Sequence, residues 1–225
     1  MPGLDPKQVR RFQQRLLRWY RRHGRDLPWR RTRDPYRILV SEVMLQQTQV
    51  ERVLGYYGRF LKRYPTIETL AASTEFEVRE AWDGLGYYAR ARNLHRTAQE
   101  VTDKHAGRIP DELDLMRRLP GIGRYTAGAV LSFAYRKDAA ILDTNAARVL
   151  TRVFGVRRYR SKNRLQQRLW TIAEAVTPAG TADQFNQAIM DLGALICRAR
   201  APECPRCPVR AACRFAAWER GKVGE

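Results

Sequence analysis

Four cysteines near the end of the chain form the most specific chemical pattern in the sequence. Cys197, Cys204, Cys207 and Cys213 follow the spacing C-x6-C-x2-C-x5-C. Four thiolates this close together can enclose one metal centre, which would be zinc or an iron–sulfur cluster. Zinc ribbons usually have two C-x2-C pairs, and only one is present here. The spacing leaves both metals open, and four unligated cysteines are the remaining alternative.

Two carboxylates could carry acid–base chemistry. Glu42 lies in the otherwise apolar segment 39–45, where burial would raise the pKa of a carboxyl group. Asp143 follows the apolar run 139–142. Cleavage of a glycosidic bond requires such a pair, an acid for the leaving group and a carboxylate for the positively charged sugar. The alternatives are a solvated helix face for Glu42 and a helix N-cap for Asp143.

Residues 119–127 read Leu-Pro-Gly-Ile-Gly-Arg-Tyr-Thr-Ala and form a turn between two expected helices. Gly121 and Gly123 permit a tight turn and a close approach of the backbone to a ligand. A helix that begins near Arg124 would expose its first N–H groups, which attract a phosphate. A simple Pro-Gly connector between helices is the alternative interpretation.

Helical periodicity extends over nearly the whole chain, and no run alternates with the period of a strand. Residues 6–23 carry apolar side chains close to a 3.6-residue period, and Asp34-Pro35 is a typical helix start. The expected helices cover residues 6–23, a segment from 35 onward, 50–63, 66–71, 75–82, 87–105, 111–118, 124–135, 143–154, 163–176 and 183–196. The sequence therefore predicts an all-α protein.

The chain has 225 residues and a formal net charge of +19, from 42 Lys and Arg against 23 Asp and Glu. This excess indicates a polyanion partner, and the predominance of arginine suits phosphate because the guanidinium donates two parallel hydrogen bonds. A basic solvated surface is the alternative, and neither an amphipathic membrane anchor nor an apolar span is evident. The N-terminus has no apolar signal core. We expect a cytoplasmic protein, nucleoid-associated if bacterial, whose cysteines are not disulfides.

Two long segments, residues 40–50 and 84–94, resemble the MutY-type adenine DNA glycosylases of the helix-hairpin-helix, endonuclease III superfamily. The cysteine spacing and the hairpin resemble the same family. Similarity runs from about Leu27 to Cys213. The resemblance implies a two-lobed, all-α helix-hairpin-helix DNA glycosylase fold with a C-terminal [4Fe–4S] cluster loop.

The implied lobes are formed by separate parts of the chain. Residues 26–140 would form a six-helix lobe that contains the hairpin. Residues 1–25 and 141–225 would form the iron–sulfur cluster lobe. The DNA cleft would lie between the lobes, with Glu42 and Asp143 facing one another across it.

The resemblance also implies a role for each catalytic residue. Glu42 would protonate the adenine that is removed, Asp143 would stabilise the oxocarbenium-like sugar, and Asn145 would orient the acidic centre. Tyr125 stands where lyase relatives have a Schiff-base lysine, so a monofunctional glycosylase is expected. Gln46, Gln47 and Tyr87 are implied to wedge into the base stack beside the flipped base. Arg30 and Gln187 are implied to line the base pocket. A core aromatic is the alternative for Tyr87.

The other implied contacts are with DNA backbone and metal. Gly121, Gly123 and Arg124 would bind the DNA backbone, and the four cysteines would hold a [4Fe–4S] cluster. The cluster loop would present a basic DNA-facing patch, formed by Arg198, Arg200, Arg206, Arg210 and Arg214. The expected partner is double-stranded DNA with a mismatch or an oxidised base, bound by a monomer.

The chain departs from the MutY pattern in three ways. Gln187 stands where a glutamate is usual, Thr144 replaces a common glycine, and the C-terminal domain that recognises 8-oxoguanine is expected to be absent. The resemblance favours excision of adenine opposite 8-oxoguanine or guanine, with thymine or uracil opposite guanine as the alternative. A lyase-type endonuclease is disfavoured by Tyr125, and a non-catalytic lesion-binding protein is disfavoured by Glu42 and Asp143.

Overall fold

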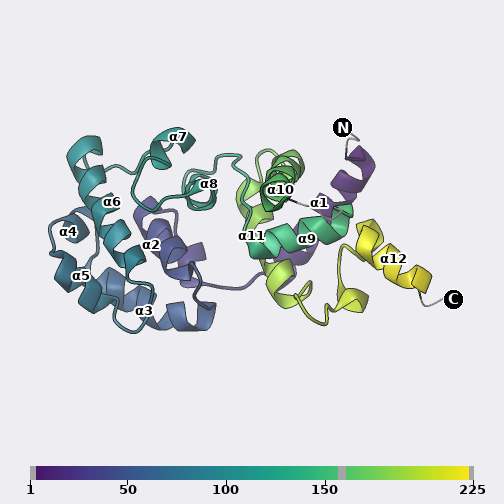
Figure 1. The fold of residues 1–225 in the computed structure, drawn as a ribbon, viewed down its shortest axis with the longest axis horizontal. Helices are drawn as coiled ribbons and strands as arrows, with labels where there is room; N and C mark the ends of the chain where they lie inside the picture. The colour runs from purple at the N-terminus through teal and green to yellow at the C-terminus, as the bar shows by residue number, and fades with distance from the viewer. Residues whose placement is uncertain (1–3, 157–160, 223–225) are drawn as a thin grey trace. The chain divides into compact units, whose positions relative to one another are not determined.

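The computed structural model describes residues 4–156 and 161–222, and in these segments it contains α-helices and 3-10 helices but no strand (Figure 1). The all-α prediction is confirmed. Across the same segments, no helix combines the length and the apolar character that crossing a membrane would require.

The chain forms two compact units. One comprises Asp26–Tyr135, and the other comprises Met1–Arg25 and Arg136–Glu225. The second division therefore falls at residues 135/136, where residues 140/141 were expected. Each unit has its own apolar core, so each is described by itself below.

The unit of residues 26–135 is built around α2 (Pro35–Leu45), which is buried over most of its length. The helix α2 packs against α3 (Val50–Arg63), α6 (Ala89–His105) and α8 (Arg124–Phe133). The shorter elements of this unit are η1 (Pro28–Arg30), α4 (Ile67–Ala71), α5 (Glu75–Ala81) and α7 (Leu113–Met116). The expected helix 111–118 is shorter in the structure, since the chain turns from Arg117 into the hairpin.

Local caps explain where several helices of this unit begin. The carboxylate of Asp34 accepts hydrogen bonds from Tyr36 N and Arg37 N, which fixes the start of α2. Thr66 and Thr74 each form a capping box, and these begin α4 and α5. The first residues of α2 are thereby set by short-range chemistry, and the buried part of the helix follows from that start.

The other unit contains α1 (Pro6–His23), α9 (Thr144–Phe154), α10 (Lys162–Val176) and α11 (Ala182–Leu195). Its core is centred on Phe12, whose ring makes edge contacts with Phe154 and Phe185. The chain ends in two 3-10 turns, η2 (Cys204–Arg206) and η3 (Arg210–Ala212), and then α12 (Arg214–Lys222). The helix α12 was not predicted. It is short, and it packs against α9, which lies far from it in the sequence.

Candidate active site and cysteine pocket

Glu42 is buried in the middle of α2, with only 4% of its surface exposed. The residues on both sides of it, Ser41 and Val43, are buried as well. A solvated helix face is therefore wrong for Glu42. Burial away from water favours the neutral, proton-carrying form of a carboxyl group, which is the form that a general acid requires.

Two of the proposed wedge residues adopt the left-handed backbone conformation. The φ angle is 55° at Gln47 and 50° at Tyr87, a region that side-chain-bearing residues rarely occupy. Tyr87 is 61% exposed, which excludes the alternative of a core aromatic. Strained backbone of this kind persists only where surrounding contacts hold it, and it often marks functional sites.

Arg90 supplies those contacts, and it was not recognised from the sequence. Its guanidinium is buried and donates to the carbonyl oxygens of Val43 and Met44 at the end of α2, at 3.1 and 2.7 Å. It also donates to Gln46 O, and at 3.1 Å to Gly86 O. Its charge lies over the Tyr87 ring, 5.5 Å from the centroid. One side chain thus joins the two segments that carry the wedge residues, one at Gln46 and Gln47 and the other at Tyr87, which we call the wedge segments. Desolvation lowers the pKa of this guanidinium from its ordinary value.

The hairpin has the geometry that its glycines predict. Gly121 has φ +73°, and a Cβ atom there would lie 2.7 Å from Cβ of Asn93. Ile122 is buried between the exposed Gly121 and Gly123 and anchors the turn, and Thr97 donates to Pro120 O at 2.8 Å. Gly123 is the N-cap of α8 and provides no side-chain acceptor. The N-terminus of α8 therefore has no side-chain cap, and a helix end of this kind favours an anionic ligand.

The first turn of α8 carries two residues of interest. Arg124 and Tyr125 are both half-buried, and they follow Gly123 directly. The next residue, Thr126, lies within reach of the wedge segment, because Gln46 Nε2 donates to Thr126 Oγ1 at 3.3 Å. The hairpin and the end of α2 are thus directly connected within this unit.

Asp143 in the other unit is the N-cap of α9, as its alternative interpretation predicted. Its Oδ1 accepts from Ala146 N at 2.6 Å, and its Oδ2 accepts from Asn145 Nδ2 at 2.9 Å. The side chain is half-buried. Both oxygens are held in place by neighbours, so the cap also orients the carboxylate. Capping and catalysis are compatible uses of the same group.

Arg148 extends this arrangement toward the cysteines. Its Nη2 donates to Asn145 Oδ1 at 2.7 Å and to Gly193 O at 2.8 Å, and its Nε donates to Cys197 O at 2.7 Å. A Cβ atom at Gly193 would lie 2.6 Å from Cβ of Asn145, so only glycine permits this close packing of α11 on α9. A continuous hydrogen-bonded chain thus joins Asp143 to the first cysteine.

Gln187 and Arg30, the residues implied to line a base pocket, lie in different units. Gln187 is half-buried on α11, and its Oε1 accepts from the Tyr20 hydroxyl on α1 at 2.5 Å. Arg30 is the last residue of η1 and is also half-buried. The amide oxygen of Gln187 accepts the hydrogen bond from Tyr20, so its NH2 group remains as a donor.

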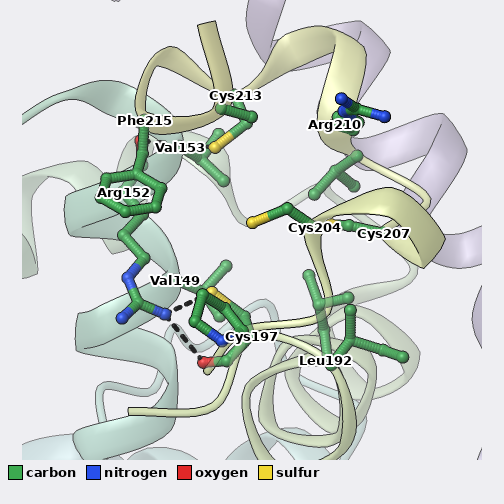
Figure 2. Close-up of a pocket in the computed structure, with 14 residues that line it drawn as sticks. Val149, Arg152, Val153, Leu192, Cys197, Cys204, Cys207, Arg210, Cys213 and Phe215 are labelled. Atoms are coloured by element: carbon green, nitrogen blue, oxygen red, sulfur yellow. Dashed lines mark hydrogen bonds between the residues drawn. The ribbon is translucent and has the colours of Figure 1, made fainter. Parts of the chain in front are cut away.

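The four cysteines line one pocket with about 370 Å³ of space free of protein atoms. Figure 2 shows them around this pocket, with the aliphatic side chains of Val149, Val153 and Leu192 beside them. They form no disulfide. Burial raises the pKa of the Cys207 thiol to about 11, and burial also raises the pKa of the Cys213 thiol. The pocket is therefore a partly buried site with four sulfur donors.

Arg152 is a charged side chain that contacts one of these sulfurs. Its Nη1 donates to Cys197 Sγ and to Cys197 O, both at 3.3 Å (Figure 2), and it also donates to Arg198 O at 2.7 Å. The guanidinium stacks on Phe215, 5.2 Å from the ring centroid. A positive donor at this position stabilises a thiolate and is a contact that the sequence did not reveal.

The expected basic patch is partly neutralised. Arg198 and Arg206 both pair with Glu203, at 3.0 and 2.6 Å. Arg200 and Arg214 are exposed, whereas Arg210 is half-buried. The loop that carries the cysteines therefore presents fewer unpaired charges than its sequence suggests.

Comparison with known proteins gives a consistent result. Residues 40–175 match the family described as HhH-GPD superfamily base excision DNA repair protein. An adenine DNA glycosylase of Buchnera aphidicola subsp. Baizongia pistaciae is 43% identical over 204 residues, which cover 90% of this chain and 58% of that protein. The chain thus spans less than two thirds of the length of this relative.

Two thymine-DNA glycosylases match over nearly their whole length. A thymine-DNA glycosylase of Aeropyrum pernix is 37% identical over 216 residues, which cover 94% of this chain and 97% of that protein. The structure of a thermostable thymine-DNA glycosylase superimposes with a TM-score of 0.85 at 32% identity, covering 94% of this chain and 98% of that chain.

Proposed function

Because this chain belongs to the HhH-GPD superfamily of base excision DNA repair proteins, we propose that it is a monofunctional DNA glycosylase that excises adenine opposite 8-oxoguanine or guanine. The observation that carries the proposal is Glu42, a carboxyl group buried in the central helix of its unit. A buried carboxyl group is costly for stability, so a catalytic use accounts for its presence.

The proposed reaction divides its work between the two units. Glu42 donates a proton to a ring nitrogen of the base, and the C1′–N bond breaks with its electron pair going to the base. The ionised carboxylate of Asp143, oriented by Asn145 and Ala146 N, stabilises the positive charge left on the sugar. Water then attacks C1′ and loses a proton. The proposal requires Glu42 and Asp143 to act on the same nucleotide.

Tyr125 supports hydrolysis over lyase chemistry. A lyase needs an amine nucleophile that forms a Schiff base with the sugar, and a phenol cannot form one. The residue follows the hairpin directly on α8, where the family's lyases place their lysine. We therefore expect base release without strong strand cleavage.

The proposed partner is duplex DNA with a mismatched or oxidised base, bound by a monomer. The N–H groups at the start of α8 would bind a backbone phosphate, while Gln46, Gln47 and the exposed Tyr87 would fill the gap that the extruded base leaves. Such a substrate would place the protein in the cytoplasm, at the nucleoid of a bacterium. We propose that the unit Asp26–Tyr135 is the lobe that contains the hairpin and that the other unit is the lobe that contains the cysteines.

The cysteine pocket fits a [4Fe–4S] cluster. Its donors are four sulfurs around one cavity, and among the described residues no three His, Cys, Asp or Glu side chains are placed to hold a single ion. Four cysteine donors at one cavity suit zinc or an iron–sulfur cluster, and the family resemblance favours the cluster. Cys197, Cys204, Cys207 and Cys213 would hold the cluster, which would order the loop when bound. Arg152 would hold the thiolate of Cys197 in place.

A second candidate, excision of thymine or uracil opposite guanine, is supported by Gln187. The Tyr20 hydroxyl occupies the Gln187 amide oxygen and leaves the amide NH2 as a donor. A donor suits the O4 acceptor of thymine or uracil, whereas the adenine amino group needs an acceptor. The Aeropyrum pernix relative is consistent with this candidate.

Single-turnover base release from duplexes with A·8-oxoguanine, A·G, G·T and G·U pairs tests both candidates. Faster release from the adenine pairs supports the main proposal. Faster release from G·T and G·U supports the second candidate. Release from none of the four pairs, with intact DNA binding, contradicts both.

A further inference from the structure

The outward face of α1 is strongly basic. Six arginines, which we call the arginine stripe, are all exposed, and they are Arg10, Arg11, Arg15, Arg18, Arg21 and Arg22. At 3.6 residues per turn, they fall within an arc of roughly 140° and extend over about 18 Å of the helix. The helix α1 contains no Asp or Glu.

The arginine stripe is not neutralised within the protein. None of the six arginines makes an ion pair with any residue in the described part of the chain. Arg11 and Arg15 are four residues apart, as are Arg18 and Arg22, and like charges at this spacing destabilise a helix. By contrast, Lys104 on α6 pairs with Glu100 one turn away. A face intended only for solubility would mix both signs in this way.

The opposite face of α1 shows which kind of polyanion can bind. Phe12 and Leu16 are fully buried and form part of the core of their unit. The helix cannot insert this face into a lipid surface without unfolding the unit, so a membrane partner is disfavoured. The composition of the stripe favours phosphate, because guanidinium groups bind phosphate oxygens in a bidentate geometry.

We propose that the arginine stripe on α1 is a second DNA-binding surface, which contacts backbone phosphates of duplex DNA. Phosphates along one strand are about 3.4 Å apart, so a length of about 18 Å corresponds to roughly five of them. This surface is separate from the hairpin, which belongs to the other unit. The inference rests on DNA being the partner, but it does not depend on which base is excised.

The test measures the affinity of the 225-residue chain for an undamaged duplex between about 50 and 200 mM salt. The test variant carries Arg11→Gln, Arg15→Gln, Arg18→Gln and Arg22→Gln. Each lost phosphate contact makes the slope of log K against log salt less steep by about 0.9, so we expect a change of about 2 to 4. Single-turnover base release at saturating DNA should stay within about twofold of the wild type, since no reacting group is changed.

Two matched variants separate a binding surface from net charge. Four arginine-to-lysine changes at the same positions should keep most of the salt slope. The charge control removes four exposed cations of the other unit, by Arg59→Gln, Lys62→Gln, Arg63→Gln and Lys104→Gln. We expect this control to change the slope by less than about one.

Three outcomes would overturn the inference. An unchanged slope in the glutamine variant, with its thermal unfolding intact, would show that the stripe does not contact DNA. If the slope of log K against log salt falls equally in the charge control, the effect comes from net charge and not from the stripe. Loss of binding to anionic phospholipid vesicles with unchanged DNA binding would assign the stripe to a membrane. Absence of base release in every protein would contradict only the proposed function.

Discussion

Among single residues, Glu42 makes the most direct prediction. Glu42→Gln preserves the size of the buried side chain but removes its acidic proton. General acid catalysis typically contributes about 10²- to 10⁴-fold, so single-turnover base release should fall by at least 10²-fold while the DNA affinity changes little. The matched control is Glu51→Gln at an exposed position of α3. Unchanged release in Glu42→Gln would remove this residue from the mechanism.

Asp143 permits two roles to be separated, because its side chain both caps α9 and faces Asn145. Asn caps a helix about as well as Asp, so Asp143→Asn should retain stability but lose the negative charge that catalysis needs. Asp143→Ala should lose both, at a cost of about 1 kcal/mol in the free energy of unfolding. Urea unfolding and base release measured on both variants check this. Full activity in Asp143→Asn would mean that the residue is only a cap.

Among the structural elements, the joined wedge segments depend on Arg90. Arg90→Met keeps much of the side-chain volume but leaves several backbone carbonyls without their donor. We expect a loss of about 1–3 kcal/mol in unfolding free energy and weaker binding to mismatched DNA. The comparison variant is Arg96→Met, at an exposed position of the same helix. If both variants unfold at the same urea concentration, Arg90 does not hold these segments.

The cysteine loop makes a prediction about metal content. Cys207→Ser should lower the iron and acid-labile sulfide bound per chain, because serine is a poor ligand for iron–sulfur clusters. The segments that line the cysteine pocket should then unfold at a lower temperature, since bound metal stabilises the fold that holds it. Elemental analysis and visible absorbance check this. A wild-type protein that contains zinc and no iron would contradict the cluster proposal.

For the whole molecule, the net charge of +19 should oppose compaction. Raising sodium chloride from about 20 to 200 mM shortens the Debye length from over 20 Å to below 10 Å and screens this repulsion. We expect the melting temperature to rise over this range, as measured by calorimetry without DNA. A falling melting temperature would mean that favourable ion pairs, such as Arg25 with the buried Asp191, outweigh the repulsion.

The sequence by itself determined the helices and the motifs they carry, because the signals that specify them are local. The cap at Asp34, the apolar period of residues 6–23 and the glycines of the hairpin act over a few residues. The residue patterns identified Glu42 and Asp143 as candidates with two interpretations of each, and the family resemblance favoured the catalytic one. Local patterns could not decide between them, since burial depends on residues far away in the chain.

Only the tertiary structure shows how deeply these two side chains are buried. Packing of α3, α6 and α8 around α2 buries Glu42, and Arg90 reaches the end of α2 from a helix more than 40 residues later. The chain of contacts from Asp143 through Asn145 and Arg148 to Cys197 joins α9 to the segment that follows α11. The arginine stripe became recognisable as an unpaired surface only when its neighbours were known. Such contacts arise from long-range packing, which no short sequence pattern encodes.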